Sequence, residues 1–201
     1  QTWEKLDQGL PSGSINVIIE HPDNSDVLFV GTENSVFVSI NGGQKWSKMT
    51  GNLPTTLYDD MLIHPRDKDL VLGTHGRSFW ILDDTTPFAE WHKSQDNNVH
   101  IFSIRSATLF YYWKDTSYRA QEEWAGPNPP YGALINFVVN SDADSATISI
   151  SRNKKVVREY NIAVTKGKLD QLVWDLKYHP PSFDRNESEI EGLTKPDPSQ
   201  L

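Results

Sequence analysis

The polar string Thr74-His75-Gly76-Arg77 is the part of this chain best suited to recognising a ligand. Glycine tolerates the backbone angles of a tight turn, so the two side chains that flank it can project together from one end of a sheet. A planar guanidinium binds a carboxylate through two parallel hydrogen bonds. We therefore predict a binding face that contains His75 and Arg77, together with Tyr58 and Asp60 from a preceding strand.

A structural role for the same arginine is the competing interpretation. Arg77 precedes Asp83 and Asp84 along the chain, and an ion pair with either acid would fasten the end of the unit that contains all three. Both roles use the same positive charge. The sequence alone leaves the choice between them open.

Two pairs of adjacent acids, Asp59-Asp60 and Asp83-Asp84, raise the question of glycoside hydrolysis. That reaction needs two carboxylates held about 5 to 9.5 Å apart. Neighbours on a strand point to opposite faces of the sheet, so neither pair can supply both the acid and the nucleophile. We expect structural or solvent-exposed roles for these acids. A hydrolase that uses one member of each pair stays open as an alternative.

Three oxygen-rich loops could hold calcium, namely Asp23-Asn24-Ser25-Asp26, Asp67-Lys68-Asp69 and Asp142-Ala143-Asp144. None has the spacing of an EF-hand or a glycine at its bend. We predict plain turns and no cofactor, with structural calcium as the alternative. His21-Pro22 and His64-Pro65 are equivalent dipeptides that we interpret as turns, and we expect no metal site.

Composition narrows the class of partner. A formal charge of −8 and a pI near 5.2 argue against nucleic acid, which needs a basic face. The absence of cysteine excludes disulfides and thiolate metal sites. No apolar run reaches the roughly 18 residues of a membrane span. The chain begins at Gln1 and not at methionine, so we expect a processed or excised start.

An internal repeat over the first ninety residues provides the framework for these side chains. Trp3-Glu4-Lys5-Leu6 returns as Trp46-Ser47-Lys48-Met49, and His21-Pro22 returns as His64-Pro65, each at an offset of 43 residues. A later Gly-Thr pair returns at an offset of 42. A period in the low forties filled with short β-rich runs is typical of propeller blades.

Each repeat contains short alternating runs bounded by turn residues, which is the pattern of antiparallel strands with one buried face. The predicted fold is therefore all-β, with the last blades of a propeller built from four-stranded antiparallel sheets. Strands are expected at Ile15–Ile19, Val27–Thr32, Val36–Ser39, Lys45–Met49, Tyr58–Ile63, Leu70–Thr74 and Ser78–Leu82.

Residues 1–90 hold too few strands to close a propeller. Trp3–Leu6 matches the outer strand of the first full repeat, so we expect it to be the outer strand of a blade whose other strands are absent. Repeat units bury their faces against neighbours, and roughly three or more are needed for stability. The expected partners are the remaining blades, from the same parent protein or from another chain.

The second half of the chain has a different organisation. Residues 91–130 form an aromatic and proline-rich linker, in which Trp91 is expected to join the two halves. Residues 131–178 contain alternating runs typical of part of an Ig-like β-sandwich, and residues 179–201 read as an acidic, proline-rich loop or tail. The predicted strands of the sandwich are Ala133–Val139, Ala146–Ser151, Val156–Ile162 and Leu172–Leu176.

The segment from Ser39 to Trp46 reads S-I-N-G-G-Q-K-W and matches the Asp-box pattern S-x-D-x-G-x-x-W, with asparagine at the aspartate position. Asn41 can hydrogen-bond its own turn, Gly43 can take the left-handed conformation, and Trp46 can pack over the hairpin. We predict a structural role for these residues and for Ser39.

Taken in order, these motifs resemble the C-terminal part of sortilin-type, Asp-box (BNR-like) propellers from large bacterial exported proteins, which are often labelled glycosyl hydrolase-like. The string from Thr74 to Asp84, T-H-G-R-S-F-W-I-L-D-D, resembles the last blade of that family. Asn128-Pro129-Pro130-Tyr131-Gly132 and Val173-Trp174-Asp175-Leu176 stand where the family has an Ig-like module similar to that of the flagellar hook cap. The resemblance covers roughly residues 1–178 and implies a secreted, periplasmic or cell-surface bacterial protein.

Three functions are compatible with these patterns. The first is a non-catalytic binding or assembly module whose ligand is a protein or a glycan, because no convergent catalytic set is visible. The second is a fragment of a glycoside hydrolase whose cleft lies mainly in missing blades. The third is a structural subunit of an envelope or secretion complex, in which another chain completes the propeller.

Overall fold

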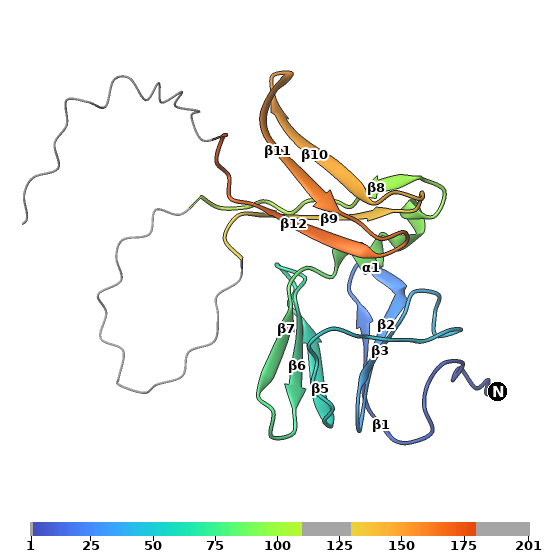
Figure 1. Ribbon diagram of the computed structural model, residues 1–201. Helices are drawn as coiled ribbons and strands as arrows, with labels where there is room; N and C mark the ends of the chain where they lie inside the picture. The colour runs from blue at the N-terminus through green and yellow to red at the C-terminus, as the bar shows by residue number, and fades with distance from the viewer. Residues whose placement is uncertain (1, 110–129, 180–201) are drawn as a thin grey trace, which may run out of the picture.

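The first sheet of the protein is a complete four-stranded blade. A computed structural model describes residues 2–109 and 130–179 (Figure 1). The blade contains β1 (Ile15–His21), β2 (Asn24–Thr32), β3 (Val36–Ser39) and β4 (Ser47–Lys48), paired antiparallel in chain order. The two residues between His21 and Asn24 form the first turn, where proline needs no ladder partner.

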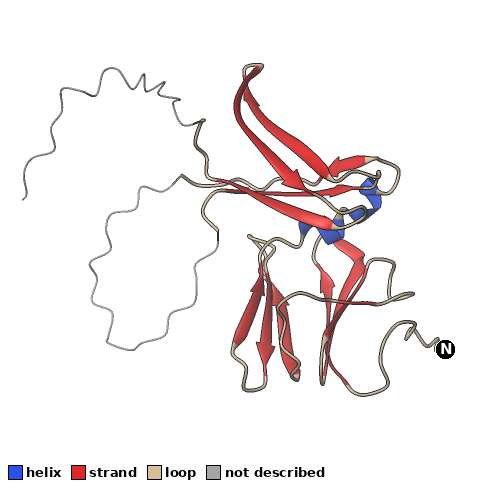
Figure 2. Cartoon of the chain, viewed as in Figure 1, coloured by secondary structure: helices blue, strands red, loops and turns tan. Residues whose placement is uncertain are grey.

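The second sheet has three strands, β5 (Tyr58–Ile63), β6 (Leu70–Thr74) and β7 (Phe79–Leu82). The predicted bounds of β3, β5 and β6 are confirmed, and those of the other blade strands differ by one to three residues at their ends. The repeat fades after Leu82, and the chain leaves the blade through α1 (Thr86–Ala89) and the 3-10 helix η1 (Trp91–Ser94). Figure 2 shows that these two short helices lie between the blades and the sheets above them.

The main hydrophobic core lies between the two blades. Val27, Phe29 and Val36 of the first blade pack with Tyr58 and Leu72 of the second, and each is at most 1% exposed. Alternation along β2 and β3 sends their other side chains to the opposite face, where a second cluster of Val30, Phe37 and Trp46 forms. Each blade is thus apolar on both faces, as stacked repeats require.

The prediction for Trp3–Leu6 is wrong, because no part of this segment forms a strand. Within the described residues it has no sheet edge to pair with, and it crosses the outer end of the first blade instead. The indole Nε1 of Trp46 donates to the carbonyl of Leu6 at 2.9 Å, and the amide of Trp46 donates to Gln8. Trp3, the repeat equivalent of the buried Trp46, is 95% exposed.

The remaining sheets form a second module. One contains β12 (Leu169–Trp174), β9 (Ala133–Val139) and β8 (Val99–Ile101) in that order, and the other is the hairpin of β10 (Ser145–Arg152) and β11 (Lys155–Ala163). All seven residues of β9 are buried. The strand β8 comes from the segment expected to be irregular and completes the central sheet by pairing with β9.

The segment after η1 ties the module together through aromatic packing. Trp91 stacks on Phe102 with ring centroids 5.8 Å apart, and His100 meets the same ring edge-on at 4.9 Å. Phe102 is 1% exposed. Trp91 therefore packs at the base of the second module, as expected of a residue that joins the halves. The other linker tryptophans, the Asn128-Pro129 part of the linker motif and residues 180–201 lie outside the described residues.

A buried polar network joins the blades to the second module. The amide Nδ2 of Asn136 in β9 donates to Asp84 Oδ2 at 2.8 Å, and both residues are at most 4% exposed. Asn136 Oδ1 in turn accepts from Gln171 in β12 at 2.9 Å. Beside them, Arg105 donates to Asp69 at 2.8 Å. The acids that end the second blade thus face the second module.

Candidate binding face

The two ends of the blade pair differ in what covers them. The second module lies against the end where β1, β3, β5 and β7 finish (Figure 1). The opposite end contains the starts of β1 and β5 and the turns that follow β2 and β6. This open end is the candidate binding face, and it includes the string Thr74-His75-Gly76-Arg77.

Equivalent threonines build the two turns of the open end. Thr32 Oγ1 donates to the carbonyl of Ser35 at 2.9 Å and accepts the amide of Ser35 at 3.1 Å. In the second blade, Thr74 Oγ1 donates to the carbonyl of Ser78 at 2.5 Å. A hydroxyl that bonds the backbone a few residues ahead fixes a turn, so the repeat predetermines where the turn residues point.

The turn that carries the histidine is also held from the side. The amide of His75 donates to the carbonyl of Leu57 at 2.9 Å, and Thr56 Oγ1 donates to the carbonyl of His75 at 3.1 Å. Gly76 has a φ of +73° with open space around it, as the sequence predicted for the tight turn. The backbone of the turn is therefore anchored on both sides while its side chains stay free.

His75 forms a pair with an acid of β5. Its Nδ1 lies 3.3 Å from Asp59 Oδ2, and the two side chains are 80% and 51% exposed. Exposed pairs of this kind contribute at most about 1 kcal/mol to stability. The pair therefore presents polar groups to solvent.

The other predicted site residues are placed differently. Tyr58 is fully buried between the blades, and its hydroxyl donates to the carbonyl of Pro54 at 2.7 Å, so it belongs to the core and not to the open face. Asp60 is exposed and accepts the amide of Met61. Arg77 is exposed, and within the described residues it forms no ion pair with Asp83 or Asp84.

The sequence could not tell whether Asp59 or Asp60 faces His75, and the structure shows that it is Asp59. It lies within reach of His75 because β5 pairs with β6 so that Tyr58 faces Thr74. The register of β5 against β6 cannot be predicted from the residues around Asp59 or from those around His75, because the two lie sixteen residues apart. The open face thus pairs His75 with Asp59, and Arg77 and Asp60 are exposed side chains of the same blade.

The hairpin at Ser39–Trp46 is stabilised by its own side chains. Ser39 Oγ donates to Asn41 Oδ1 and accepts the amide of Gly43, both at 2.9 Å, and Asn41 Oδ1 accepts the amide of Lys45 at 3.0 Å. Gly43 has a φ of +83°. Trp46 is 5% exposed. Asn41 uses only its carbonyl oxygen in these bonds, and an aspartate would offer an oxygen at the same place.

The oxygen-rich loops pair their acids with cations. Asp23 lies 3.0 Å from Lys68 Nζ, Asp67 lies 2.8 Å from Arg66, and Asp142 lies 3.0 Å from Lys166. Among residues 2–109 and 130–179, no group of three His, Asp or Glu side chains could hold a metal ion. Ion pairs therefore account for acids that the sequence left open to calcium.

The equivalent histidines each cap their own turn. His21 Nδ1 accepts the amide of Asp23 at 3.1 Å, and His64 Nδ1 accepts the amide of Asp67 at 3.2 Å. In each repeat the imidazole nitrogen accepts the amide hydrogen bond in the turn that follows the first strand of the blade, β1 or β5. The two histidines thus make the same local bond, and the buried His21 also bonds Thr85 through Nε2.

A cleft of about 580 Å³ lies where the first blade, the short helices and β12 meet. Its apolar lining includes Val38, Met49, Phe88, Trp91 and Leu169. These residues come from parts of the chain up to 131 positions apart, so no local pattern could have revealed the cleft. The open face and this cleft lie at different ends of the blades.

Comparison with known proteins decides the family. The family model described as Sortilin-Vps10, "Sortilin, neurotensin receptor 3", matches residues 1–161, which is most of the chain. The chain belongs to the sortilin-Vps10 family. No curated protein and no solved structure gives a significant match.

The sortilin-Vps10 match includes both blades and extends into β11. It confirms the predicted sortilin-type propeller and the all-β fold. In the sortilin-Vps10 chain, the helices of the described residues are too short and too polar to cross a membrane.

Proposed function

We propose that this sortilin-Vps10 chain is a non-catalytic binding module whose open face recognises a protein or a glycan. The observation that carries the proposal is the asymmetry of the blade ends: one is covered by the second module, and the other presents His75 and Arg77 on an anchored turn beside Asp59 of β5. Anchoring the backbone lowers the entropy lost when such side chains bind.

The open face carries both a positive and a negative group, so it can bind either sign of charge in a ligand. Arg77 has no acidic partner among the described residues and offers a fork to a carboxylate, while Asp59 and Asp60 offer oxygens to hydroxyls or cations. Binding at an exposed surface of this kind fits a macromolecular ligand. Within residues 2–109, the open face has no buried pair of carboxylates that point toward each other, so we expect no catalysis there. Hydrolysis of a glycan would contradict the proposal.

We further propose that a neighbouring blade covers the outer face of the second blade. Val36 opposes Gly31 in the first blade, and Phe79 opposes Gly73 in the second, so Val36 and Phe79 are equivalent. Val36 is 1% exposed against the second blade, whereas Phe79 is 75% exposed. By the repeat, the face around Phe79 is a blade-docking face.

We propose on these grounds that residues 1–90 are propeller blades of the Asp-box type and that residues 131–178 are part of an Ig-like sandwich, to which the linker of residues 91–130 contributes β8. The remaining blades come from the same parent protein or from another chain. If another chain supplies them, the protein is a structural subunit of an envelope or secretion complex, and this is the second candidate. The family favours a secreted, periplasmic or cell-surface location.

The test compares binding of the full chain with that of two variants on a protein array and a glycan array. His75→Ala/Arg77→Ala should abolish the signals that the wild-type chain gives. The control Arg66→Ala removes an exposed arginine from the opposite end of the blades, where it pairs with Asp67, and should bind like the wild type. Hydrolysis of a glycan that Asp59→Asn or Asp60→Asn abolishes would refute a non-catalytic module.

A further inference from the structure

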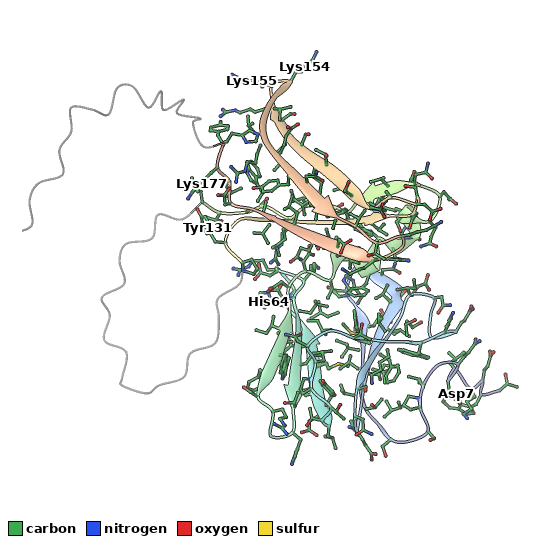
Figure 3. All side chains as sticks on the ribbon, in the orientation of Figure 1. Asp7, His64, Tyr131, Lys154, Lys155 and Lys177 are labelled. Atoms are coloured by element: carbon green, nitrogen blue, oxygen red, sulfur yellow. The ribbon has the colours of Figure 1, made fainter. Side chains whose placement is uncertain are left out.

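The tip of the β10–β11 hairpin concentrates positive charge in an otherwise acidic chain. Residues 152–158 read R-N-K-K-V-V-R and contain four basic residues and no acid. Figure 3 shows Lys154 and Lys155 at the tip, at the far end of the hairpin from the blades, with Lys177 on the same side of the module. We call Arg152, Lys154, Lys155, Arg158 and Lys177 the basic patch.

The charges of the basic patch are not compensated within residues 2–109 and 130–179. Elsewhere in the same module, Lys166 pairs with Asp142 at 3.0 Å and Lys168 pairs with Asp170 at 2.8 Å, both near the opposite end of the hairpin. None of the five patch residues forms such a pair. The nearest acid along the strand, Glu159, accepts a hydrogen bond from Ser149 instead.

Arg152 and Lys155 of the basic patch line an open hollow of about 600 Å³. Tyr178 lines the hollow and is 56% exposed. Its hydroxyl accepts from Arg152 Nη1 at 3.0 Å, and its carbonyl accepts from Arg158 Nη1 at 3.3 Å. The two guanidinium groups are therefore held beside the ring, with Arg158 also 5.1 Å from the centre of the Tyr160 ring.

Two features of the basic patch lower the stability of the fold. Asn153 and Lys154 have φ values of +51° and +63°, which is the two-residue hairpin turn that strongly prefers glycine at its second position. Arg158 Nε is buried without a partner among the described residues. Strained or unsatisfied groups persist where they serve a function, and here both carry positive charge.

We propose that the basic patch binds a polysaccharide that carries carboxylate groups. Its ammonium and guanidinium groups suit carboxylates, and the exposed ring of Tyr178 suits the apolar face of a sugar. The charges extend from the hollow to the hairpin tip, so they match several acidic sugars in a row and not a single one.

The experiment measures binding of polygalacturonate to the full chain at low and high salt. Binding should be detectable at low salt and should weaken as salt rises, because exposed charges are screened. The fully methyl-esterified polymer keeps the sugar but loses the charge, and it should not bind. Equal binding of the esterified polymer would overturn the proposal, and so would the absence of polygalacturonate binding.

Matched lysine variants locate the site. Lys154→Gly/Lys155→Gln should weaken binding about fivefold to twentyfold, while the control Lys166→Gln/Lys168→Gln, which removes the same charge from the paired lysines, should change it less than about twofold. Lys154→Gly should also raise the melting temperature, because glycine suits the left-handed turn. Loss of binding with a gain of stability excludes misfolding as the cause. Equal effects of the two double variants would overturn the assignment.

The same assay distinguishes two other possible ligands of the basic patch, an acidic peptide and the chain's own acidic segment. If polyglutamate binds as tightly as polygalacturonate, the ring contributes nothing and the patch is a docking site for acidic peptides, contrary to the proposal. If polygalacturonate binds only after Asp184→Asn/Glu187→Gln/Glu189→Gln, the chain's own acidic segment competes for the patch, and an external polysaccharide is not its resident ligand. The patch and the open face share no residue, so failure of one leaves the other proposal intact.

Discussion

At the scale of single residues, Asn41 replaces the aspartate of the motif and keeps the same hydrogen bonds. The hairpin uses one side-chain oxygen of Asn41 to accept from Ser39 and from the amide of Lys45. Asn41→Asp keeps that oxygen and should alter the free energy of unfolding by less than about 0.5 kcal/mol. Ser39→Ala removes a hydroxyl that is 1% exposed and should cost about 1 to 3 kcal/mol, because the amide of Gly43 loses its acceptor. Urea unfolding of both variants gives the comparison, and equal losses would contradict this account of the hairpin.

His21 is a buried residue whose proton can be placed from its neighbours. Its Nδ1 accepts the amide of Asp23, so the hydrogen of the neutral ring is on Nε2 and is donated to Thr85 Oγ1 at 3.0 Å. Thr85 Oγ1 in turn donates to the carbonyl of Lys68. Burial lowers the pKa of His21 below its usual value of 6.5, outweighing the nearby charge of Asp23.

This pKa predicts a pH dependence of stability. Because the folded pKa lies below the unfolded one, the contribution of His21 is complete above about pH 6.5 and is lost as the pH falls below that value. The urea midpoint should therefore drop between pH 7.5 and pH 5.5, and His21→Gln should remove part of that drop. The explanation fails if His21→Gln leaves the drop unchanged.

At the scale of elements, equivalent glycines have different tolerances because only one lies between blades. A Cβ at Gly31 would lie 2.8 Å from Val17 Cγ1 and 3.0 Å from Tyr58 Cβ, whereas a Cβ at Gly73 would meet nothing closer than 3.4 Å. Gly31→Ala should destabilise the protein by about 1 to 3 kcal/mol through overpacking of the blade contact. Gly73→Ala should be neutral or slightly stabilising. Thermal unfolding of the two variants distinguishes them, and a loss of similar size in both would show that packing between the blades is not the cause.

The strands themselves were predictable where alternation ran for four or more residues between turn formers. The repeat then predicted the blades, because the apolar run of Val36, Phe37 and Val38 returns as Phe79, Trp80 and Ile81 at the equivalent place in the second blade. β8 is three residues long, and Val99–Ile101 is too short for its pattern to differ from chance. It exists because β9 needs a partner on that edge. Trp3–Leu6 failed for the opposite reason, since it has a strand-like sequence and no edge to pair with.

At the scale of the whole molecule, the candidate face was only partly visible in the sequence. His75 and Arg77 are adjacent to a turn glycine and could be found locally, whereas Asp59 required the β5–β6 register and Tyr58 required knowledge of the blade contact. The basic patch could be counted from residues 152–158, but its link to Tyr178 arises only when the chain returns beside β11. Long-range placement is what the sequence could not supply.

The junction between the blades and the second module gives the last prediction. Asn136→Leu leaves the carboxylate of Asp84 buried without its amide donor, and a hydrogen bond to a charged group is worth about 1.5 to 3 kcal/mol. Asp84→Asn/Asn136→Leu removes the charge as well and should recover part of that loss, because the remaining buried group is neutral. Gln171→Leu is the control, since Gln171 donates to the side-chain oxygen of Asn136 from an exposed position and has no contact with the acid.

Local opening of the junction is the expected consequence of the single variant, because the network connects two modules that each have their own packed strands. Limited proteolysis should therefore cut Asn136→Leu faster than the wild type between residues 83 and 98, where the chain passes from β7 through α1 and η1. The double variant should be cut at an intermediate rate, and Gln171→Leu at the wild-type rate. Faster cutting throughout the chain would instead mean that the variant unfolds globally and that the blades and the second module act as one cooperative unit.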